Sequence, residues 1–224
     1  TVELNMNRRR ASLAALLGLG LIGAGAAWAL EPGKDYLVIK NAAPSQSGPK
    51  IEVIEAFSYM CPHCNDLEPK IQAWVKKLPA DAVYRRLPVV FRDSWAPIAR
   101  TYYTLEVMGQ LDSLHNKIFE AIHKQNVDLS SEGNVFEWIA KQGIDQKKFI
   151  ETYKSFGITS KLNRGNQLTR SYNIGGVPAL VIEGKYQTSA TQVGNYDKML
   201  AAADELIMLA RVERKLAGEM AKPK

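Results

Sequence analysis

The stretch Ile51-Glu-Val-Ile-Glu-Ala-Phe-Ser-Tyr-Met-Cys-Pro-His-Cys64 decides the fold of this chain. Its first seven residues are rich in β-forming side chains and predict a central strand. Two cysteines follow that strand, and from Leu67 onward apolar residues recur at helical spacing. Residues 82–91 then read as a second strand. The sequence therefore predicts a strand–helix–strand unit whose first loop carries the cysteines.

Residues 95–172 have a helical pattern throughout. Apolar residues recur at helical spacing in four groups, which begin at Ile98, Leu114, Val135 and Phe149. Glycines at positions 109, 143 and 157 are expected to separate these helices. The block interrupts the alternation of strand and helix, so it is expected to form an all-helical insertion.

The remainder of the chain returns to strands. Residues 36–40 predict a short edge strand, and Ala179–Glu183 and Tyr186–Ser189 predict two strands joined by a tight turn. Asn195 is suited to cap a last helix that runs to about Arg214. The fold class is therefore α/β, with a helical block inserted in its middle.

Length and composition fit one domain with a sizeable insertion. The chain has 224 residues, of which 46% are hydrophobic and 23% charged, and these values argue against intrinsic disorder and against a multi-span membrane protein. Two cysteines are too few for a disulfide-rich scaffold or a four-thiolate zinc site. Their spacing, Cys61 and Cys64, is the informative feature.

The N-terminal residues 1–29 read as an export signal. Arg8-Arg9-Arg10 precedes an uncharged apolar run that ends in Ala27-Trp28-Ala29, a small-x-small cleavage site. The alternative is an uncleaved membrane anchor, because the run approaches spanning length. Export would place the cysteines where disulfides persist, and we expect a periplasmic protein.

The positive charge gives little support to nucleic-acid binding. The net charge is +6, and the predicted signal carries three arginines and one glutamate of that total, which leaves about +4 on the mature chain. The remaining basic residues are scattered, with Lys76-Lys77 and Arg85-Arg86 as short doublets and no aromatic-rich stripe beside them. We therefore expect no nucleic-acid partner.

The cysteine pair lies where a strand ends and a helix begins. At a helix start the first sulfur faces unpaired backbone N–H groups and the positive end of the helix dipole, and His63 adds a nearby positive charge. These features favour the thiolate of Cys61, which we expect to act as the nucleophile, with Cys64 as the resolving thiol. Pro62 suits the first helical turn because its missing N–H costs little there.

Three other interpretations of the cysteines are weaker. A structural disulfide closing so short a loop would contribute little stability. A zinc site needs further ligands, and His115 and His123 are expected to lie on separate helical surfaces, so no metal site is predicted. Haem attachment requires a histidine after the second cysteine, where Asn65 stands.

The apolar run with its cleavage site, Cys61-Pro-His-Cys64, the helical block and Gly176-Val-Pro178 together resemble the DsbA family of bacterial periplasmic thiol:disulfide oxidoreductases. The resemblance implies a thioredoxin fold divided into residues 30–94 and 173–224 by a helical domain at 95–172. It also implies disulfide formation in newly exported, unfolded polypeptides with free thiols. A quinone-linked, DsbB-like membrane protein would reoxidise the enzyme, which is expected to be a monomer without metal or organic cofactor.

The resemblance also assigns roles to residues outside the cysteine pair. It implies a cis bond between Val177 and Pro178, next to the cysteines, where an extended substrate could pair with the backbone. Met60, Pro62 and Val177 are expected to form an apolar surface for unfolded polypeptides.

Glu55 lies on the same strand face as Ile51, Val53 and Phe57, an unusual place for a charge. The resemblance implies that it moves protons at Cys64, whereas the alternative is a strand-edge carboxylate that reaches solvent.

Glu68, one helical turn after Cys64, matches a second acid of the family, although an exposed helix face would also explain it. The family's type member pairs these acids with a lysine on the next strand. This chain offers Tyr84, Arg85 and Arg86 there.

Two other functions remain open from the sequence. One is a reductase or isomerase that keeps the cysteine pair reduced. The other is a thioredoxin-like binding or chaperone module in which the cysteines are incidental. Replacing Cys61 with serine separates them, because an oxidase loses all activity and a chaperone keeps suppressing aggregation.

Overall fold

The computed structural model describes residues 30–40, 45 and 47–220. The predicted signal peptide therefore lies outside the described residues. Among those that are described, no helix combines the length and the apolar character needed to cross a membrane.

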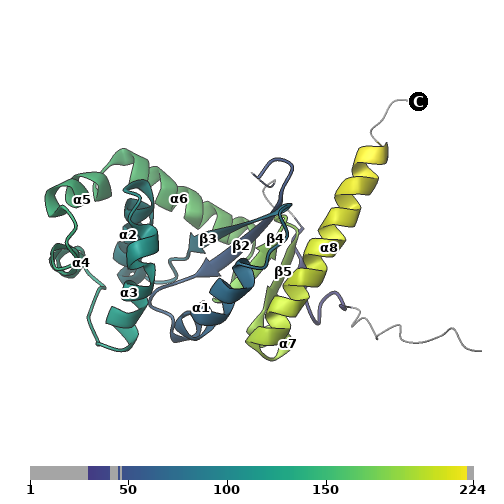
Figure 1. Cartoon of the computed structure of the whole chain (residues 1–224), viewed down its shortest axis with the longest axis horizontal. Helices are drawn as coiled ribbons and strands as arrows, with labels where there is room; N and C mark the ends of the chain where they lie inside the picture. The colour runs from purple at the N-terminus through teal and green to yellow at the C-terminus, as the bar shows by residue number, and fades with distance from the viewer. Residues whose placement is uncertain (1–29, 41–44, 46, 221–224) are drawn as a thin grey trace, which may run out of the picture.

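A five-stranded mixed sheet forms the centre of the molecule, in the order β1-β5-β4-β2-β3 (Figure 1). The strands are β1 (Leu37–Val38), β2 (Ile51–Phe57), β3 (Ala82–Pro88), β4 (Ala179–Ile182) and β5 (Tyr186–Ser189). The pair β2–β3 is parallel and the other pairs are antiparallel. Because Ala56 lies opposite Ala179, the end of β2 that leads to the cysteines meets the start of β4, just after Pro178.

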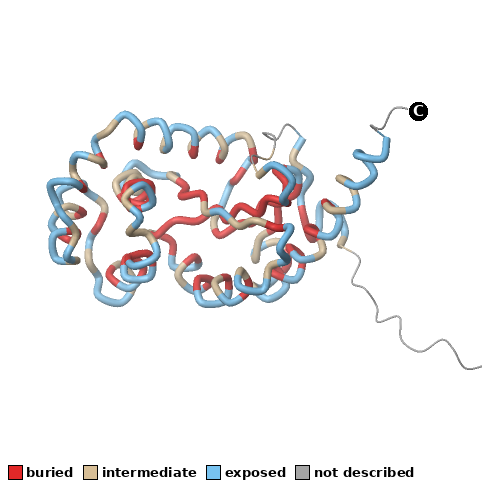
Figure 2. Tube along the Cα trace, turned by 45° about the horizontal axis from the view of Figure 1, so that its top comes forward, coloured by how far each residue is buried: buried red, intermediate tan, exposed pale blue. Residues whose placement is uncertain are grey.

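Helices cover both faces of the sheet, so every residue of β2 is buried (Figures 1 and 2). On one face, α1 (Pro62–Val75) and α8 (Tyr196–Met220) pack against Ile51, Val53 and Leu180. On the other face, the C-terminal part of α6 (Phe156–Ser171) and the residues after it cover Ile54 and Val181. A short helix, α7 (Ala190–Val193), precedes α8.

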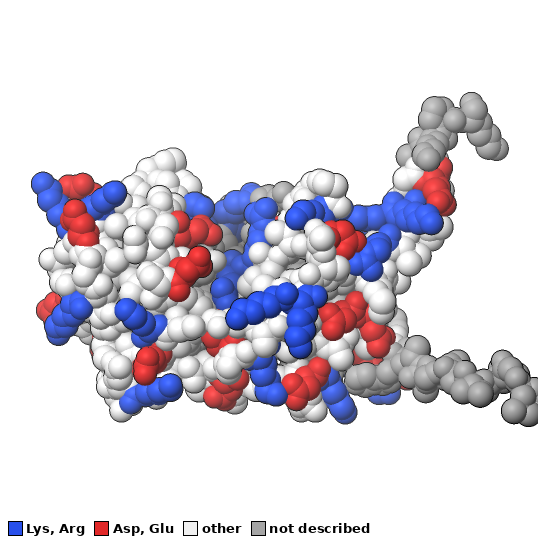
Figure 3. Space-filling model, viewed as in Figure 1, with Lys and Arg blue, Asp and Glu red and all other residues white. Residues whose placement is uncertain are grey.

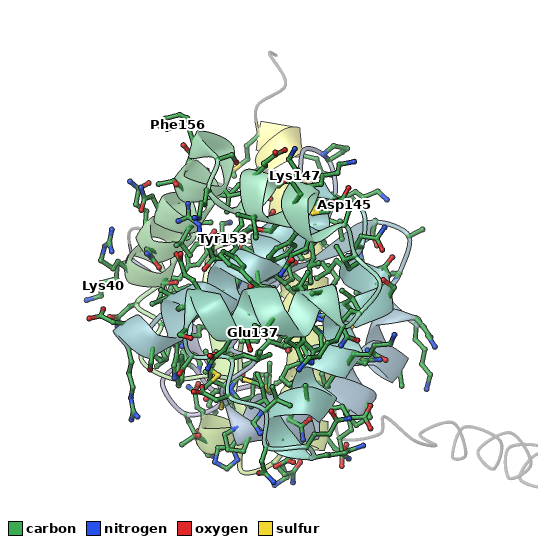
Figure 4. All side chains as sticks on the ribbon, turned by 90° about the vertical axis from the view of Figure 1, so that its left-hand side faces the viewer. Lys40, Glu137, Asp145, Lys147, Tyr153 and Phe156 are labelled. Atoms are coloured by element: carbon green, nitrogen blue, oxygen red, sulfur yellow. The ribbon has the colours of Figure 1, made fainter. Side chains whose placement is uncertain are left out.

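The inserted helices stand beside the end of the sheet that carries the cysteines. They are α2 (Ala96–Val107), α3 (Leu111–His123), α4 (Glu132–Ala140), α5 (Gln146–Tyr153) and α6, after a 3-10 turn at Asp93–Trp95. Tyr153 is buried among them, whereas Phe156 projects outward at the start of α6 (Figure 4). The apolar core of these helices is continuous with Phe57, Tyr59 and both cysteines. The insertion therefore packs directly against residues 58–61, the loop between β2 and α1 that leads into the cysteine pair and is called the redox loop below.

Most of the predicted elements are present, but several of their bounds differ. The sequence pattern predicts a break at Gly157, but that residue lies in the first turn of α6. The break comes at Ser155, which caps the helix because its side chain accepts a hydrogen bond from the Ile158 amide. The strand expected over 82–91 ends at Pro88, and the edge strand expected over 36–40 is limited to Leu37–Val38.

The last helix begins where it is predicted to begin. The Asn195 side chain accepts a hydrogen bond of 2.8 Å from the Lys198 amide and caps α8. The helix then continues past Arg214 to Met220.

Charged side chains of both signs are interspersed over the face shown in Figure 3. This distribution agrees with the scattered charges of the sequence.

Candidate redox-active site

Cys61 and Cys64 lie at the junction of β2 and α1. The amide of Cys61 donates to the Ser58 carbonyl at 3.1 Å, and the amide of Cys64 donates to the Cys61 carbonyl at 3.1 Å, which starts the helix. Cys61 occupies the N-cap position and Pro62 the first turn, as predicted. Both cysteines are free thiols and both are buried, although Cys61 is 8% exposed and Cys64 only 1%.

The surroundings of Cys61 favour its thiolate. A hydrogen bond from the Cys64 thiol lowers the pKa of Cys61 to about 6, and the nearby amides of Cys64 and His63 and the charge of His63 act in the same direction against burial. The amides approach the sulfur without forming a capping hydrogen bond. Of the groups that lower the pKa of Cys61, the neighbouring Cys64 thiol has the largest effect and the charge of the exposed His63 the smallest.

Cys64 has the opposite character. Its burial raises the pKa well above the ordinary value of a thiol, and its interaction with Cys61 raises it further. The two sulfurs are thus chemically unequal: Cys61 ionises easily and can be reached from solvent, whereas Cys64 keeps its proton.

The loop before β4 completes the cysteine face. The Val177–Pro178 peptide bond is cis, and the Cys61 thiol donates a hydrogen bond of 3.4 Å to the Val177 carbonyl. Met60 and Val177 are half-buried and Pro62 is exposed, so apolar side chains lie around the more accessible sulfur.

Glu55 is completely buried beneath this site, which rules out the alternative of a carboxylate that reaches solvent. It lies opposite Arg86 in the parallel register of β2 and β3. Tyr84 Oη donates to Glu55 Oε2, and Arg86 Nε lies 3.2 Å from the same oxygen. Burial raises the pKa of Glu55 to about 7, even though Arg86 opposes the change.

Glu68 and Arg86 join Glu55 in one buried network. Arg86 Nη2 donates to Glu68 Oε1 at 2.8 Å, so one guanidinium bridges the two carboxyl groups. Arg86, on β3, therefore supplies the cation that the two acids share. Glu68 is 5% exposed, so its alternative assignment to an exposed helix face is wrong.

Two histidines that were expected on the helix surface contact the redox loop instead. His115 is 4% exposed, with Nδ1 2.6 Å from Tyr59 Oη and Nε2 3.1 Å from Glu68 Oε1. His123 Nε2 lies 2.8 Å from the Tyr59 carbonyl. The expectation was wrong because α3 packs its apolar side against Phe57 and Tyr59.

A signal for His115 was present in the sequence. The residue falls among Leu111, Leu114, Ile118 and Ile122, which repeat at the spacing of a buried helix face.

A cavity lies on another side of the same network. It measures about 470 Å³, is lined by residues of β2, β3, α2 and α6, and includes Tyr84 and Arg86 but neither cysteine. The two side chains that contact Glu55 therefore also border this cavity.

Comparisons with known proteins agree with this geometry. Residues 52–206 match the family model described as a DSBA-like thioredoxin domain. The chain is 38% identical over 183 residues to the thiol:disulfide interchange protein DsbA of Pseudomonas aeruginosa, which covers 82% of this chain and 87% of the relative. It is 37% identical over 206 residues to DsbA of Pseudomonas syringae pv. tomato, with coverage of 91% and 96%.

Solved structures show the same similarity. The crystal structure of Pseudomonas aeruginosa DsbA superposes with a TM-score of 0.78 at 38% identity, covering 82% of this chain and 95% of that one. The oxidoreductase DsbA from Xylella fastidiosa gives a TM-score of 0.76 at 27% identity, with coverage of 82% and 98%. With its thioredoxin-like sheet, its inserted helices and its cysteine pair at the start of α1, this chain belongs to the family of DSBA-like thioredoxin domains.

Proposed function

We propose that this protein is a thiol:disulfide oxidoreductase that introduces disulfide bonds into unfolded exported polypeptides. The inequality of Cys61 and Cys64 carries the proposal. A stabilised Cys61 thiolate favours the reduced enzyme, and a pair whose reduced form is favoured is an oxidant in its disulfide form.

The proposed reaction moves two electrons from substrate to enzyme. A substrate thiolate attacks the Cys61 sulfur of the Cys61–Cys64 disulfide, a mixed disulfide forms, and Cys64 leaves and takes up a proton. A second substrate thiolate then attacks the substrate sulfur of the mixed disulfide. The substrate disulfide forms, and Cys61 leaves as a thiolate stabilised by its surroundings.

Glu55 is the proposed proton donor and acceptor for Cys64. A carboxyl group with a pKa of about 7 is present in both protonation states at neutral pH, which suits a group that gives and receives protons. Its influence on the pKa of Cys64 supports this role.

Val177 and Pro178 are proposed to form the substrate-binding edge beside Cys61. The Val177 carbonyl lies within hydrogen-bonding distance of the reactive sulfur, so an extended substrate that pairs with this backbone would bring its own sulfur close. Met60 and Pro62 offer apolar contact on either side.

The proposed setting is the periplasm, with the protein acting as a monomer. The basic and apolar segment in residues 1–29 supports export. Reoxidation of Cys61 and Cys64 needs an acceptor for two electrons, and we propose a DsbB-like, quinone-linked membrane protein for this step.

A redox titration of the cysteine pair against glutathione tests the direction of the reaction. We expect the reduction potential of the pair to be far less negative than the roughly −270 mV of thioredoxin. It should approach the roughly −120 mV of DsbA, a relative of this chain. A potential close to that of thioredoxin would refute the oxidase and favour a reductase.

Replacement of Cys61 with serine tests the need for the sulfur. We expect C61S to lose all oxidation of a reduced, unfolded client. If C61S retained full activity in promoting folding of that client, the protein would be a chaperone whose cysteines are incidental.

The variant E55Q tests the proton transfer. Because general acid–base catalysis contributes roughly 10²–10⁴-fold, we expect reaction of oxidised E55Q with a dithiol at pH 7 to be slower by at least about tenfold. The pH profile should also lose its inflection near pH 7. Glu137, exposed on α4 in Figure 4, provides the control E137Q, which should match the wild type. An unchanged E55Q profile would exclude Glu55 from the step.

A further inference from the structure

His115, in the inserted helix α3, contacts the carboxyl network beneath the cysteines. We propose that it is a positioning residue: it holds Glu68 as a carboxylate, so that the proton exchanged with Cys64 goes to Glu55. The inference rests on the proposed proton transfer at Cys64 and identifies what directs it.

The network has two acids and one permanent cation. Arg86 contacts Glu55 Oε2 at 3.2 Å and Glu68 Oε1 at 2.8 Å, and both carboxyl groups are buried. One guanidinium cannot balance two buried carboxylates, so one carboxyl is favoured to hold a proton near neutral pH. The remaining neighbours decide which one it is.

Those neighbours favour charge on Glu68. Besides Arg86, Glu68 Oε1 receives a hydrogen bond of 2.7 Å from Gln72 Nε2 and lies 3.1 Å from His115 Nε2. Burial opposes ionisation of Glu68, but the contacts with His115 and Arg86 outweigh it and lower its pKa. Glu55 has only Tyr84 and Arg86 as its polar contacts, and one oxygen of each carboxyl group, Glu55 Oε1 and Glu68 Oε2, has no partner among the described residues.

The hydrogen-bonding pattern also selects one form of the imidazole. Tyr59 Oη is close to Nδ1 at 2.6 Å, and its hydroxyl can donate to that nitrogen. The ring proton then lies on Nε2, which is 3.1 Å from Glu68 Oε1, although the angle between the described residues is not that of a full hydrogen bond. Burial lowers the pKa of His115, which favours the neutral ring with its Nε2 proton beside the Glu68 carboxylate.

The charged and titratable groups that act on His115 are Asp112 on α3 itself, Glu68 on α1, Arg86 on β3 and Tyr59 in the redox loop. Glu55, Tyr84 and Tyr102 act in turn on Arg86. Of the described groups that contact Glu68, His115 is the one that belongs to the inserted helices. The insertion thus acts on the proton path through Glu68.

Two substitutions separate this role from simple packing. In H115Q the side-chain amide nitrogen can occupy the place of Nε2 and still donate to Glu68. In H115N the shorter amide can reach only the place of Nδ1, next to Tyr59. Both variants lose the ring, so a packing role alone predicts the same result for both.

The direct measurement is titration of the two carboxyl groups by carbon NMR in reduced protein labelled at glutamate carboxyl carbons. In H115N we expect the titration midpoint of Glu68 to rise and that of Glu55 to fall below about 7, with H115Q close to the wild type. The H115N reaction with a dithiol at pH 7 should also slow by about threefold or more, because less Glu55 is protonated. Equal titration curves in H115N and H115Q, or an unchanged Glu68 midpoint in H115N, would overturn the proposal.

Nitrogen NMR of the wild-type protein answers the question if H115N fails to fold. We expect His115 to be neutral at about pH 7 with its proton on Nε2, because burial lowers its pKa. A proton on Nδ1, or a charged ring, would overturn the proposal. These titrations do not depend on client oxidation, so they remain informative even if the redox potential refutes the oxidase function.

Discussion

The ionisation of Cys61 predicts a pH-dependent difference in stability between the reduced and the oxidised protein. Its pKa is lowered from 9.0 to about 6 in the folded chain. A lowered pKa adds stability to the folded, reduced form above the unfolded pKa, and this stability is lost as the pH falls through the folded value. The oxidised protein has no thiol at either position, so its stability lacks this contribution.

The size of the effect follows from the two pKa values. At pH 7 the folded thiol is about nine-tenths ionised and the unfolded thiol about one-hundredth, which stabilises the reduced form by about 1.4 kcal/mol. At pH 5 both states are protonated and the contribution falls to about 0.1 kcal/mol. Cys64 does not titrate in this range because burial raises its pKa in the folded state.

Urea unfolding of both redox forms between pH 5 and 7.5 measures the contribution. We expect the free energy of unfolding of the reduced form, minus that of the oxidised form, to rise by about 1.3 kcal/mol between pH 5 and 7. Alkylation of Cys61 by iodoacetamide should follow the same midpoint, near pH 6. A flat difference curve, or alkylation with a midpoint near pH 9, would refute the assignment of a stabilised thiolate.

Two further predictions concern the buried network and the helical insertion. Replacing Arg86 with methionine leaves two buried carboxyl groups without their cation and should cost about 3–5 kcal/mol in urea unfolding at pH 7. The same change at Arg85, whose side chain is 51% exposed, should cost less than about 1 kcal/mol, and equal losses would contradict the account. A β-carbon at Gly165 would lie 2.4 Å from Tyr103 Oη, so G165A should lose about 1–3 kcal/mol of stability. The control is G133A, whose added β-carbon meets no atom within 4 Å and lies in a helix, so its stability should rise by up to about 1 kcal/mol. If G165A were as stable as the wild type, Tyr103 would have to move freely out of the way.

The order of the main elements could be predicted from the sequence because it depends on local patterns. The strand Ile51–Phe57 has the predicted bounds, and Asn195 caps the last helix as expected. Residues 95–172 were expected to be helical, but α6 could not be assigned as a separate helix because its mean composition is polar. Ile158, Gly165 and Thr169 are its buried positions, and they become visible only when the neighbouring elements are placed.

The cysteines could be identified from spacing, but the network beneath them could not. Arg86 could be named as a strand residue, yet its role depends on the parallel register that sets it opposite Glu55. His115 reaches Glu68 from an element 47 positions further along the chain, and this proximity is a tertiary property. Sequence patterns show which residue types are available, whereas the register and the packing decide which of them meet.

The position of the Val177 carbonyl has a consequence for the choice of clients. If clients pair with this main-chain acceptor as proposed, it would recognise no particular side chain, and any polypeptide with a free amide could satisfy it. Most amides of a protein that has completed its own sheets and helices are already paired within that protein. The site would therefore discriminate by folding state, accepting a chain early and losing its hold on the same chain once that chain has folded.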